Sequence, residues 1–310
     1  MKSKLLISTL LFSSILAADL QAQEFTKRNR YTTLGVNAMA AGYYGDVTPG
    51  PSILSTDPKL IRYNVGIYAQ RKFYPNWSAR VSLSYGRLRG DDAESAKKFE
   101  TEDAGRWERN LSFRNDIKEL SAVAIYDLKA NYNTFFKRPE FTPYIFAGVA
   151  VFHHNPKAYY EGNLLETGWY ALQPLQTEGV KYSKVQFSIP FGFGARFRLN
   201  QNFDLGFEVG WRRTFTDYLD DVSTKYADKG DLNTAHGKEA WVLSDRSIEL
   251  PDFIDKQTTI TGSDGQVYPA TYISNAGQQR GDHTRNDWYI LTGFTLNYIL
   301  DQSYKTPKFR

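Results

Sequence analysis

Residues 185–199 alternate strictly between apolar and polar side chains, and this stretch limits the possible folds more than any other. Every even position in it holds a polar or charged residue, glycine or proline. The apolar residues at the odd positions are Val185, Phe187, Ile189, Phe191, Phe193, Ala195, Phe197 and Leu199. Because successive side chains of a β-strand point to opposite faces, the pattern predicts a strand with one apolar and one polar face. Its length, about twice that of an ordinary globular strand, is typical of a strand that crosses a membrane.

The N-terminus has the pattern of a secretory leader. Two lysines precede an apolar run from Leu5 to Ala18, and Leu20-Gln21-Ala22 fits a small-residue cleavage site before Gln23. We therefore expect residues 1–22 to be a signal peptide, since the apolar run is shorter than the roughly 20 residues that a membrane-spanning helix needs. The chain has no cysteine, which excludes disulfides, thiolate metal sites and a lipid-modified cysteine anchor. An exported chain without disulfides fits a bacterial envelope.

The composition agrees with an amphipathic wall. Aromatic residues make up 15 % of the chain, with 21 Tyr and 20 Phe, as expected for the aromatic girdles of a membrane barrel. The chain holds 38 basic and 34 acidic residues; the leader removes two basic and one acidic, which leaves a net charge of +3. This balance gives no indication of nucleic-acid binding.

Eight segments alternate well enough to predict strands. They are residues 31–41, 62–73, 77–90, 116–130, 142–154, 184–199, 203–215 and 287–300. The first and fifth of these are weaker, because residues 38–41 and 147–151 are apolar on both faces. Strands of this length favour a barrel over a soluble β-sandwich, which is the alternative for such a pattern.

The connections between these segments alternate in length. The short ones are 74–76, 131–141 and 200–202, and the long ones are 42–61, 91–115, 156–183 and 216–286. Outer-membrane barrels have short periplasmic turns and long extracellular loops. We therefore predict an all-β fold over residues 23–300, an eight-stranded antiparallel transmembrane β-barrel with long loops on one side. It would lie in the outer membrane of a diderm bacterium with both termini in the periplasm, followed by a short basic tail at 301–310.

Charged residues on the polar faces of these strands would lie inside the barrel. Eight strands enclose a space that side chains fill, and buried charges are tolerated only when they are paired. The sequence thus predicts an interior charge network rather than a transport path. Its members are Arg80, Glu119, Arg196, Arg198, Glu208 and Arg212, with Asp127 and Asp204 as further acids. Glycines at 192, 194, 206 and 210 would make room for the arginines.

No arrangement of residues indicates an enzyme. His153 and His154 are adjacent, so in a strand they point to opposite faces and cannot share a metal. Asp217, Asp220 and Asp221 are close in sequence, but they lack calcium-loop spacing, and capping is the commoner use of such residues. We expect no catalytic residues, metal, cofactor, nucleic acid or small-molecule substrate. An outer-membrane lipid-modifying enzyme and a small pore are the alternatives.

The longest connection, 216–286, carries 12 acidic and 7 basic residues, a net charge of −5. Structureless loops of this length are uncommon unless they function or are disordered. This one is expected either to fold over the barrel mouth or to bind a partner.

Several motifs occur in an order that resembles a known family. They are residues 43–46, 86–92, 110–113, 143–158, 174–179, 189–197 and 216–226. Together they resemble the PorG-like outer-membrane β-barrel family of the Bacteroidota type IX secretion system. The run that begins at Thr216, Thr-Asp-Tyr-Leu-Asp-Asp-Val-Ser, is the most distinctive. The resemblance covers residues 30–226 and the last strand, whereas 227–286 matches nothing in it.

The resemblance implies a non-enzymatic barrel that serves type IX protein secretion or gliding. It would anchor or dock a periplasmic PorK–PorN-type lipoprotein ring, with outer-membrane lipids as its other partner, and it brings no catalytic residues. The cationic turn and tail on the predicted periplasmic side are the expected contacts, namely Lys137, Arg138, Lys305, Lys308 and Arg310. The distinctive motifs fall in the predicted extracellular loops, so either they are structural or the orientation is reversed.

Overall fold

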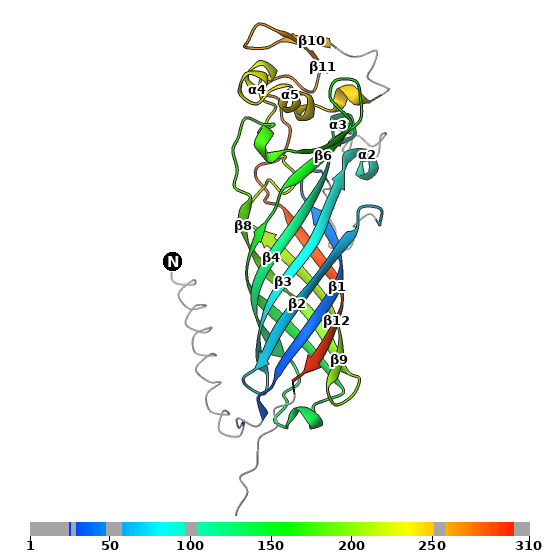
Figure 1. Cartoon of the computed structure of the whole chain (residues 1–310), viewed down its shortest axis with the longest axis vertical. Coiled ribbons are helices and arrows are strands. Elements are labelled where there is room, and N and C mark those ends of the chain that lie inside the picture. Colours follow the sequence, from blue (N-terminus) through cyan, green and yellow to red (C-terminus); the bar gives the residue numbers. More distant parts are fainter. Residues whose placement is uncertain (1–24, 26–28, 48–57, 97–103, 251–257, 301–310) are drawn as a thin grey trace, which may run out of the picture.

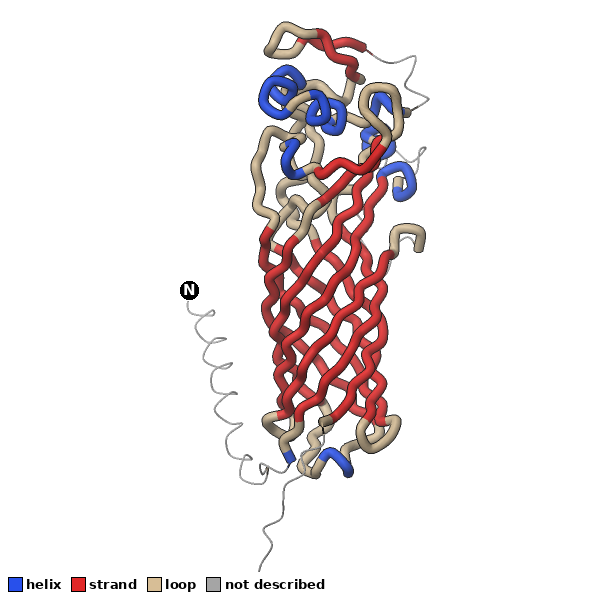
Figure 2. Tube along the Cα trace, in the orientation of Figure 1, coloured by secondary structure: helices blue, strands red, loops and turns tan. Residues whose placement is uncertain are grey.

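The computed structural model describes residue 25 and residues 29–47, 58–96, 104–250 and 258–300. Eight long strands form a closed barrel (Figures 1 and 2). They are β1 (Thr32–Tyr44), β2 (Arg62–Lys72), β3 (Trp77–Asp91), β4 (Ser112–Asp127), β5 (Phe141–His153), β8 (Val185–Arg198), β9 (Phe203–Thr214) and β12 (Trp288–Ile299). Each pairs antiparallel with the next of the eight, and β12 pairs with β1 and closes the barrel. The predicted fold class is confirmed.

The eight predicted segments correspond to these eight strands, with bounds that differ by a few residues. The largest shift is in β4, which begins at Ser112 instead of residue 116. The reason is its partner: β3 continues to Asp91, which pairs with Ser112. The β3–β4 hairpin therefore extends beyond the other strands, as Figure 1 shows.

The two ends of the barrel differ. At the turn end, short connections join β2 to β3, β4 to β5 and β8 to β9, and the connection 128–140 contains the short helix η3 (Phe135–Lys137). The first residue of β1 and the last residue of β12 also lie at the turn end (Figure 1). All longer connections lie at the opposite end, the loop end. This is the predicted alternation of connection lengths.

Burial along β8 shows which face points outward. The apolar side chain of Phe187 is 63 % exposed, whereas the neighbouring Ser188 is 2 % exposed. The other strands follow the same rule, with large apolar side chains on the exterior at Val36, Ile67, Leu83, Leu120, Val149, Phe193, Phe207 and Phe294. We call this surface the exterior band. A soluble β-sandwich would bury its apolar face, so that alternative is wrong.

The long connections at the loop end fold into a cap over the barrel mouth (Figure 2). Its elements are α2 (Asp92–Ser95), α3 (Ala104–Arg109), β6 (Pro156–Tyr160), β7 (Gly168–Ala171), η4 (Gln173–Leu175), α4 (Lys229–His236), α5 (Lys238–Ser244), η5 (Ser247–Glu249), β10 (Thr258–Thr261) and β11 (Val267–Ala270). The cap has its own core, in which Trp241 and Leu243 of α5 pack with Tyr160 of β6, Leu232 of α4 and Tyr268 of β11. Of the two outcomes expected for the loop 216–286, its described part folds over the mouth.

A second core fills the loop end of the barrel itself. Its barrel residues are Met39, Ala41, Tyr43, Leu88, Phe113, Ile117, Phe152, Tyr289 and Leu291. Leu219 and Val222 pack against them from residues 216–226, a segment we call the plug. Because the interior is apolar here, the ends of β1 and β5 carry apolar residues on both faces. This explains the weak alternation of those two segments.

Candidate functional site

Cross-barrel ion pairs occupy the middle of the interior. Glu208 accepts hydrogen bonds from Arg80 and, at 2.5 Å, from the Tyr144 hydroxyl; the shortest distance between the Arg80 and Glu208 charges is 2.7 Å. Nearer the loop end, Glu119 lies 3.5 Å from Arg212 and accepts a 2.5 Å hydrogen bond from a tyrosine of β12. Four of the residues predicted to lie inside the barrel thus form two ion pairs, Arg80 with Glu208 and Arg212 with Glu119.

Two further carboxylates hold the turn end of the interior. Asp127 pairs with Arg196 and, at 2.6 Å, with Lys72. Asp204 pairs with Arg138 at 2.7 Å. These groups and the ones in the middle come from most of the barrel strands and one turn, so each ion pair ties distant parts of the wall together.

Two of the sequence-based assignments need correction. Arg198 is not part of the interior network: it ends β8 at the barrel rim, where its side chain is 28 % exposed and lies 3.5 Å from Glu140. Arg138 does not lie on an exposed docking surface. It is buried, and besides Asp204 it donates hydrogen bonds to four backbone carbonyls of the turns, at residues 135, 200, 201 and 203. The turn 128–140 folds back over the barrel opening and carries this side chain inward.

Of the other basic residues expected to contact a partner, only Lys137 lies in the described part of the chain. Lys137 is exposed at the turn end, next to the exposed Phe136. Lys305, Lys308 and Arg310 lie outside the described residues, as does the predicted signal peptide.

The interior glycines make room, but not only for arginines. A side-chain carbon at Gly210 would lie 2.5 Å from the Arg212 guanidinium, as expected. At Gly194 the same carbon would lie 2.6 Å from the ring of Tyr144. The small residue there lets Tyr144 reach Glu208.

Asp220 of the plug and Asp287, the residue before β12, form a carboxyl pair that shares one phenol. The Tyr43 hydroxyl lies 2.6 Å from an oxygen of Asp220 and 2.8 Å from an oxygen of Asp287. A phenol has one proton to donate, so one of the two carboxyls must be protonated and donate to the phenol oxygen. Burial raises the pKa of both carboxyls well above the usual range. Repulsion acts in the same direction, from Asp46 on Asp220 and from Asp220 on Asp287. Both effects favour the protonated form of the pair at the barrel mouth.

The rest of the plug is held by hydrogen bonds from the cap. Asp221 accepts hydrogen bonds from Thr177 and Tyr182. Glu178 accepts the backbone N–H groups of Ser223 and Thr224 at 2.9 Å. The most distinctive motif of the sequence is thus a structural element that closes the barrel mouth.

The stability of the plug is expected to depend on the protonation of Asp217. Burial raises the pKa of this carboxyl from 3.8 to about 8, and the nearby carboxylates of Asp46 and Glu178 also raise it. A pKa that is higher in the folded state means that folding takes up a proton, so this contribution is complete below pH 4 and is lost as the pH rises toward 8. Asp217→Asn is expected to stabilise the plug at pH 7.5 by ~1–2 kcal/mol.

Hydrogen exchange over residues 216–226, corrected for intrinsic rates, measures this effect. In the unmodified chain, protection should fall between pH 5.5 and 7.5, and in D217N the fall should be smaller. An equal fall in both proteins would show that Asp217 does not control the plug.

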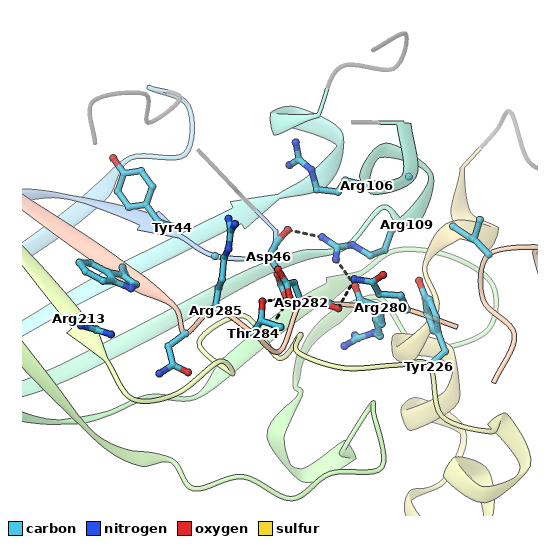
Figure 3. Close-up of a pocket in the computed structure, with 17 residues that line it drawn as sticks. Tyr44, Asp46, Arg106, Arg109, Arg213, Tyr226, Arg280, Asp282, Thr284 and Arg285 are labelled. Carbon is cyan, nitrogen blue, oxygen red and sulfur yellow. Dashed lines mark hydrogen bonds between the residues drawn. The ribbon is translucent and has the colours of Figure 1, made fainter. Parts of the chain in front are cut away.

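A cleft of about 900 Å³ lies beside the plug at the loop end. Its wall comes from the end of β1, α3, the start of β12 and residues 279–286, as Figure 3 shows. Five arginines line it, namely Arg106, Arg109, Arg213, Arg280 and Arg285, with only Asp46 and Asp282 as acids among its lining residues. Tyr44, Tyr226 and Trp288 add aromatic surface.

Two of these arginines are structural and were missed at the sequence level. Arg109 makes a two-pronged ion pair with the buried Asp92 at 2.8 and 2.9 Å. Arg280 binds Glu178 at 2.9 Å and the carbonyl of Asp221 at 2.6 Å. Asp92 and Arg109 lie 17 residues apart in one connection, and Glu178 and Arg280 come from two different connections, so no local pattern indicates either pairing.

The two adjacent histidines have different surroundings. His153 is exposed, whereas His154 is buried between the Asn115 amide and the carbonyl of Ser183. Burial lowers the pKa of the His154 imidazole to about 4, so the ring is neutral and structural.

Within the described ranges, no three His, Asp or Glu side chains are grouped closely enough to hold a metal ion. Among the helices that the structure describes, none has the length and apolar character needed to span a membrane.

A family model described as "Domain of unknown function (DUF6089)" matches residues 10–236. No curated protein matches the chain. Solved outer-membrane structures are similar to this one. A major outer membrane protein from Thermus thermophilus is 11 % identical in sequence, covers 87 % of this chain and 99 % of its own, and has a TM-score of 0.37. The outer membrane protein OprG from Pseudomonas aeruginosa is 8 % identical, covers 89 % of this chain and 98 % of its own, and has a TM-score of 0.36. Ail of Yersinia pestis, in complex with the heparin analogue sucrose octasulfate, is 6 % identical, covers 88 % of this chain and 99 % of its own, and has a TM-score of 0.35.

Proposed function

We propose that this chain, which belongs to the DUF6089 family, is a non-enzymatic outer-membrane β-barrel that anchors a periplasmic partner of the type IX secretion machinery. The observation that carries the proposal is a wall that is apolar outside and filled with ion pairs inside. An apolar exterior suits a membrane, and a paired, filled interior makes the barrel rigid.

The exterior band supports the membrane location. Monomeric soluble proteins rarely expose apolar patches larger than a few hundred Å², whereas here every barrel strand contributes exposed apolar side chains. A closed barrel also satisfies its backbone hydrogen bonds internally, which is the condition for β-structure in lipid.

The filled interior favours an anchor over a pore. Arg80, Glu208 and Tyr144 meet across the middle of the barrel, and the plug closes the loop end with the apolar side chains of Leu219 and Val222. A transport path would require these contacts to separate. We therefore place the function on the outer surfaces of the molecule.

The turn end offers the surface that fits an acidic periplasmic partner. Lys129 and Lys137 are exposed there, and Phe136 is 47 % exposed beside them. Aromatic and basic side chains together are typical of a protein–protein contact. The resemblance to PorG-like barrels names the partner that we propose, a PorK–PorN-type lipoprotein ring, and the tail 301–310 is a further candidate contact.

The structural role of the plug supports the orientation. In PorG-like barrels the partner ring lies in the periplasm, yet the motifs of the resemblance lie at the loop end. Because most of residues 216–226 are buried between barrel and cap, they need no partner to explain them. The turn end can therefore face the periplasm without conflict.

Reversing the exposed charges of the turn end is expected to weaken partner binding. The double variant Lys129→Glu and Lys137→Glu should lower the amount of ring that co-purifies from mild-detergent membranes by roughly tenfold, because rim charges steer association. Deleting residues 301–310 should lower it further. The measurement is quantitative mass spectrometry of the affinity-purified barrel.

The matched control is Lys181→Glu with Lys238→Glu, which makes the same charge change on exposed residues of the cap. It should leave recovery of the ring unchanged. Arg138 is not a suitable test residue, since reversing a buried charge would disturb the barrel itself. If the double variant and the tail deletion both leave recovery of the ring unchanged, the proposed interface is wrong. If the chain conducts ions in planar bilayers, the small pore becomes the better explanation.

A further inference from the structure

The cleft at the loop end has more positive charge than its surroundings neutralise. Arg109 and Arg280 are paired with Asp92 and Glu178. Arg213 and Arg285 are exposed on the cleft wall, and no carboxylate of the described residues lies within ion-pair distance of either. The two lining acids accept hydrogen bonds elsewhere, Asp46 from the backbone N–H of Asp282 at 2.9 Å and Asp282 from the Thr284 hydroxyl at 2.6 Å.

The cleft also contains a buried donor that lacks an acceptor. Tyr226 is 4 % exposed, and its hydroxyl makes no hydrogen bond to any described residue. Burial raises the pKa of this phenol, so it remains a donor at physiological pH. An unsatisfied buried hydroxyl is destabilising, and an acceptor oxygen of a ligand would satisfy it. Figure 3 shows Arg213 at one end of the cleft and Tyr226 at the other, with Arg285 and Arg109 between them.

This spacing fits an elongated ligand with more than one anionic oxygen. The volume of about 900 Å³ is within the range of small-molecule sites. Arginine is the side chain best suited to phosphate, because its planar fork donates two parallel hydrogen bonds. A polar, arginine-rich wall with a few aromatic rings suits a phosphorylated saccharide.

The position of the cleft indicates where such a ligand would come from. Tyr44 ends β1 and Trp288 begins β12, so both stand where the exterior band stops. The guanidinium of Arg213 lies over the Trp288 ring, 5.5 Å from its centre. Large aromatic residues at the end of an apolar wall mark the membrane–water interface, so the cleft is at headgroup level.

We propose that this cleft binds the phosphorylated saccharide headgroup of a glycolipid in the leaflet that surrounds the loop end. Arg213 and Arg285 bind one phosphate, and Tyr226 donates to an anionic oxygen at the other end of the headgroup. The proposal rests on the outer-membrane location and orientation argued above, but not on the secretion partner.

The test uses the full chain in phosphatidylcholine nanodiscs that contain a limiting amount of bis-phosphorylated lipid A, with bound lipid counted by native mass spectrometry. Arg213→Gln with Arg285→Gln is expected to lower lipid A retention by at least tenfold, since hydrogen bonds between two charged groups are about twice as strong as neutral ones. Tyr226→Phe, which removes only the hydroxyl, should lower it about threefold to tenfold. Arg71→Gln, an exposed arginine at the turn end, should have no effect.

Two further probes separate the sources of phosphate. Lipid A without its phosphates should not be retained, and inorganic pyrophosphate titrated into the detergent-solubilised chain should bind more weakly than the lipid. Pyrophosphate binding without lipid A retention would overturn the glycolipid assignment, and equal retention by all variants would overturn the site. Heat-modifiability on gels shows that each variant is folded, and no secretion partner is present, so failure here is distinct from failure of ring docking.

Discussion

Replacing Arg80 by leucine is expected to destabilise the barrel by about 3–5 kcal/mol, the usual effect of removing one partner from a buried ion pair. Glu208 would remain among buried groups with only the Tyr144 hydroxyl as a hydrogen-bond donor. Arg80 also lies over the ring of Tyr68, 4.7 Å from its centre, so packing is lost as well. The measurement is the free energy of unfolding by urea in phosphatidylcholine vesicles, followed by the gel shift of the folded form.

The double variant Arg80→Leu with Glu208→Leu separates charge from packing. If the unpaired carboxylate causes the loss, removing it should restore most of the stability, because a buried pair can often be replaced by apolar residues with little effect. If the double variant is as unstable as R80L, the loss of stability comes from lost packing and not from the unpaired charge. Unchanged stability of R80L itself would contradict a filled interior.

Replacing Lys229 by methionine is expected to loosen the cap by about 3–5 kcal/mol while the barrel stays folded. The Lys229 ammonium is buried and donates to Asp245 at 2.7 Å and to the carbonyl of Pro269 at 2.6 Å. Methionine fills a similar volume but leaves the Asp245 carboxylate without its counter-charge. Because the cap has its own core, its opening should be local. Hydrogen exchange over residues 229–244 should rise, and the gel shift should persist.

The control is Lys238→Met, an exposed lysine on the adjacent helix α5, which should leave exchange unchanged. Adding Asp245→Asn to K229M should recover part of the protection, since the remaining group is then neutral. Loss of the gel shift in K229M would mean that cap and barrel unfold together, against the separation of the two cores.

The strands could be predicted because their signal is local. In β8 the identity of each residue follows from which face it occupies, because one face is part of the apolar exterior band and the other lines the charged interior. The weak segments show the limit of this rule: residues 38–41 of β1 are apolar on both faces because Leu219 and Val222, far along the chain, line the inside there. A pattern within one strand carries no information about a plug that comes from elsewhere.

The residues of the interior and of the cleft also differ in how far the sequence could predict them. Arg80 and Glu208 lie on polar faces of strands, so their inward direction followed from alternation. Arg138 and Arg198 stand at or beyond strand ends, where the alternation rule stops and backbone geometry decides; one turned inward and the other lies at the rim. The pairing of Arg280 with Glu178 depends on two connections meeting at the barrel mouth, which only the fold brings about.

The sequence by itself determined a closed barrel of eight strands, its apolar outer face, the charged filling of its interior and the division into a turn end and a loop end. The tertiary structure alone decided that the long connections build a second core, that the motif at 216–226 is a plug, and that five arginines surround a cleft. The physical reason is the range of the interactions. Alternation is set by neighbours two residues apart in one strand, whereas the plug, the cap and the cleft depend on contacts between segments that are remote in the chain.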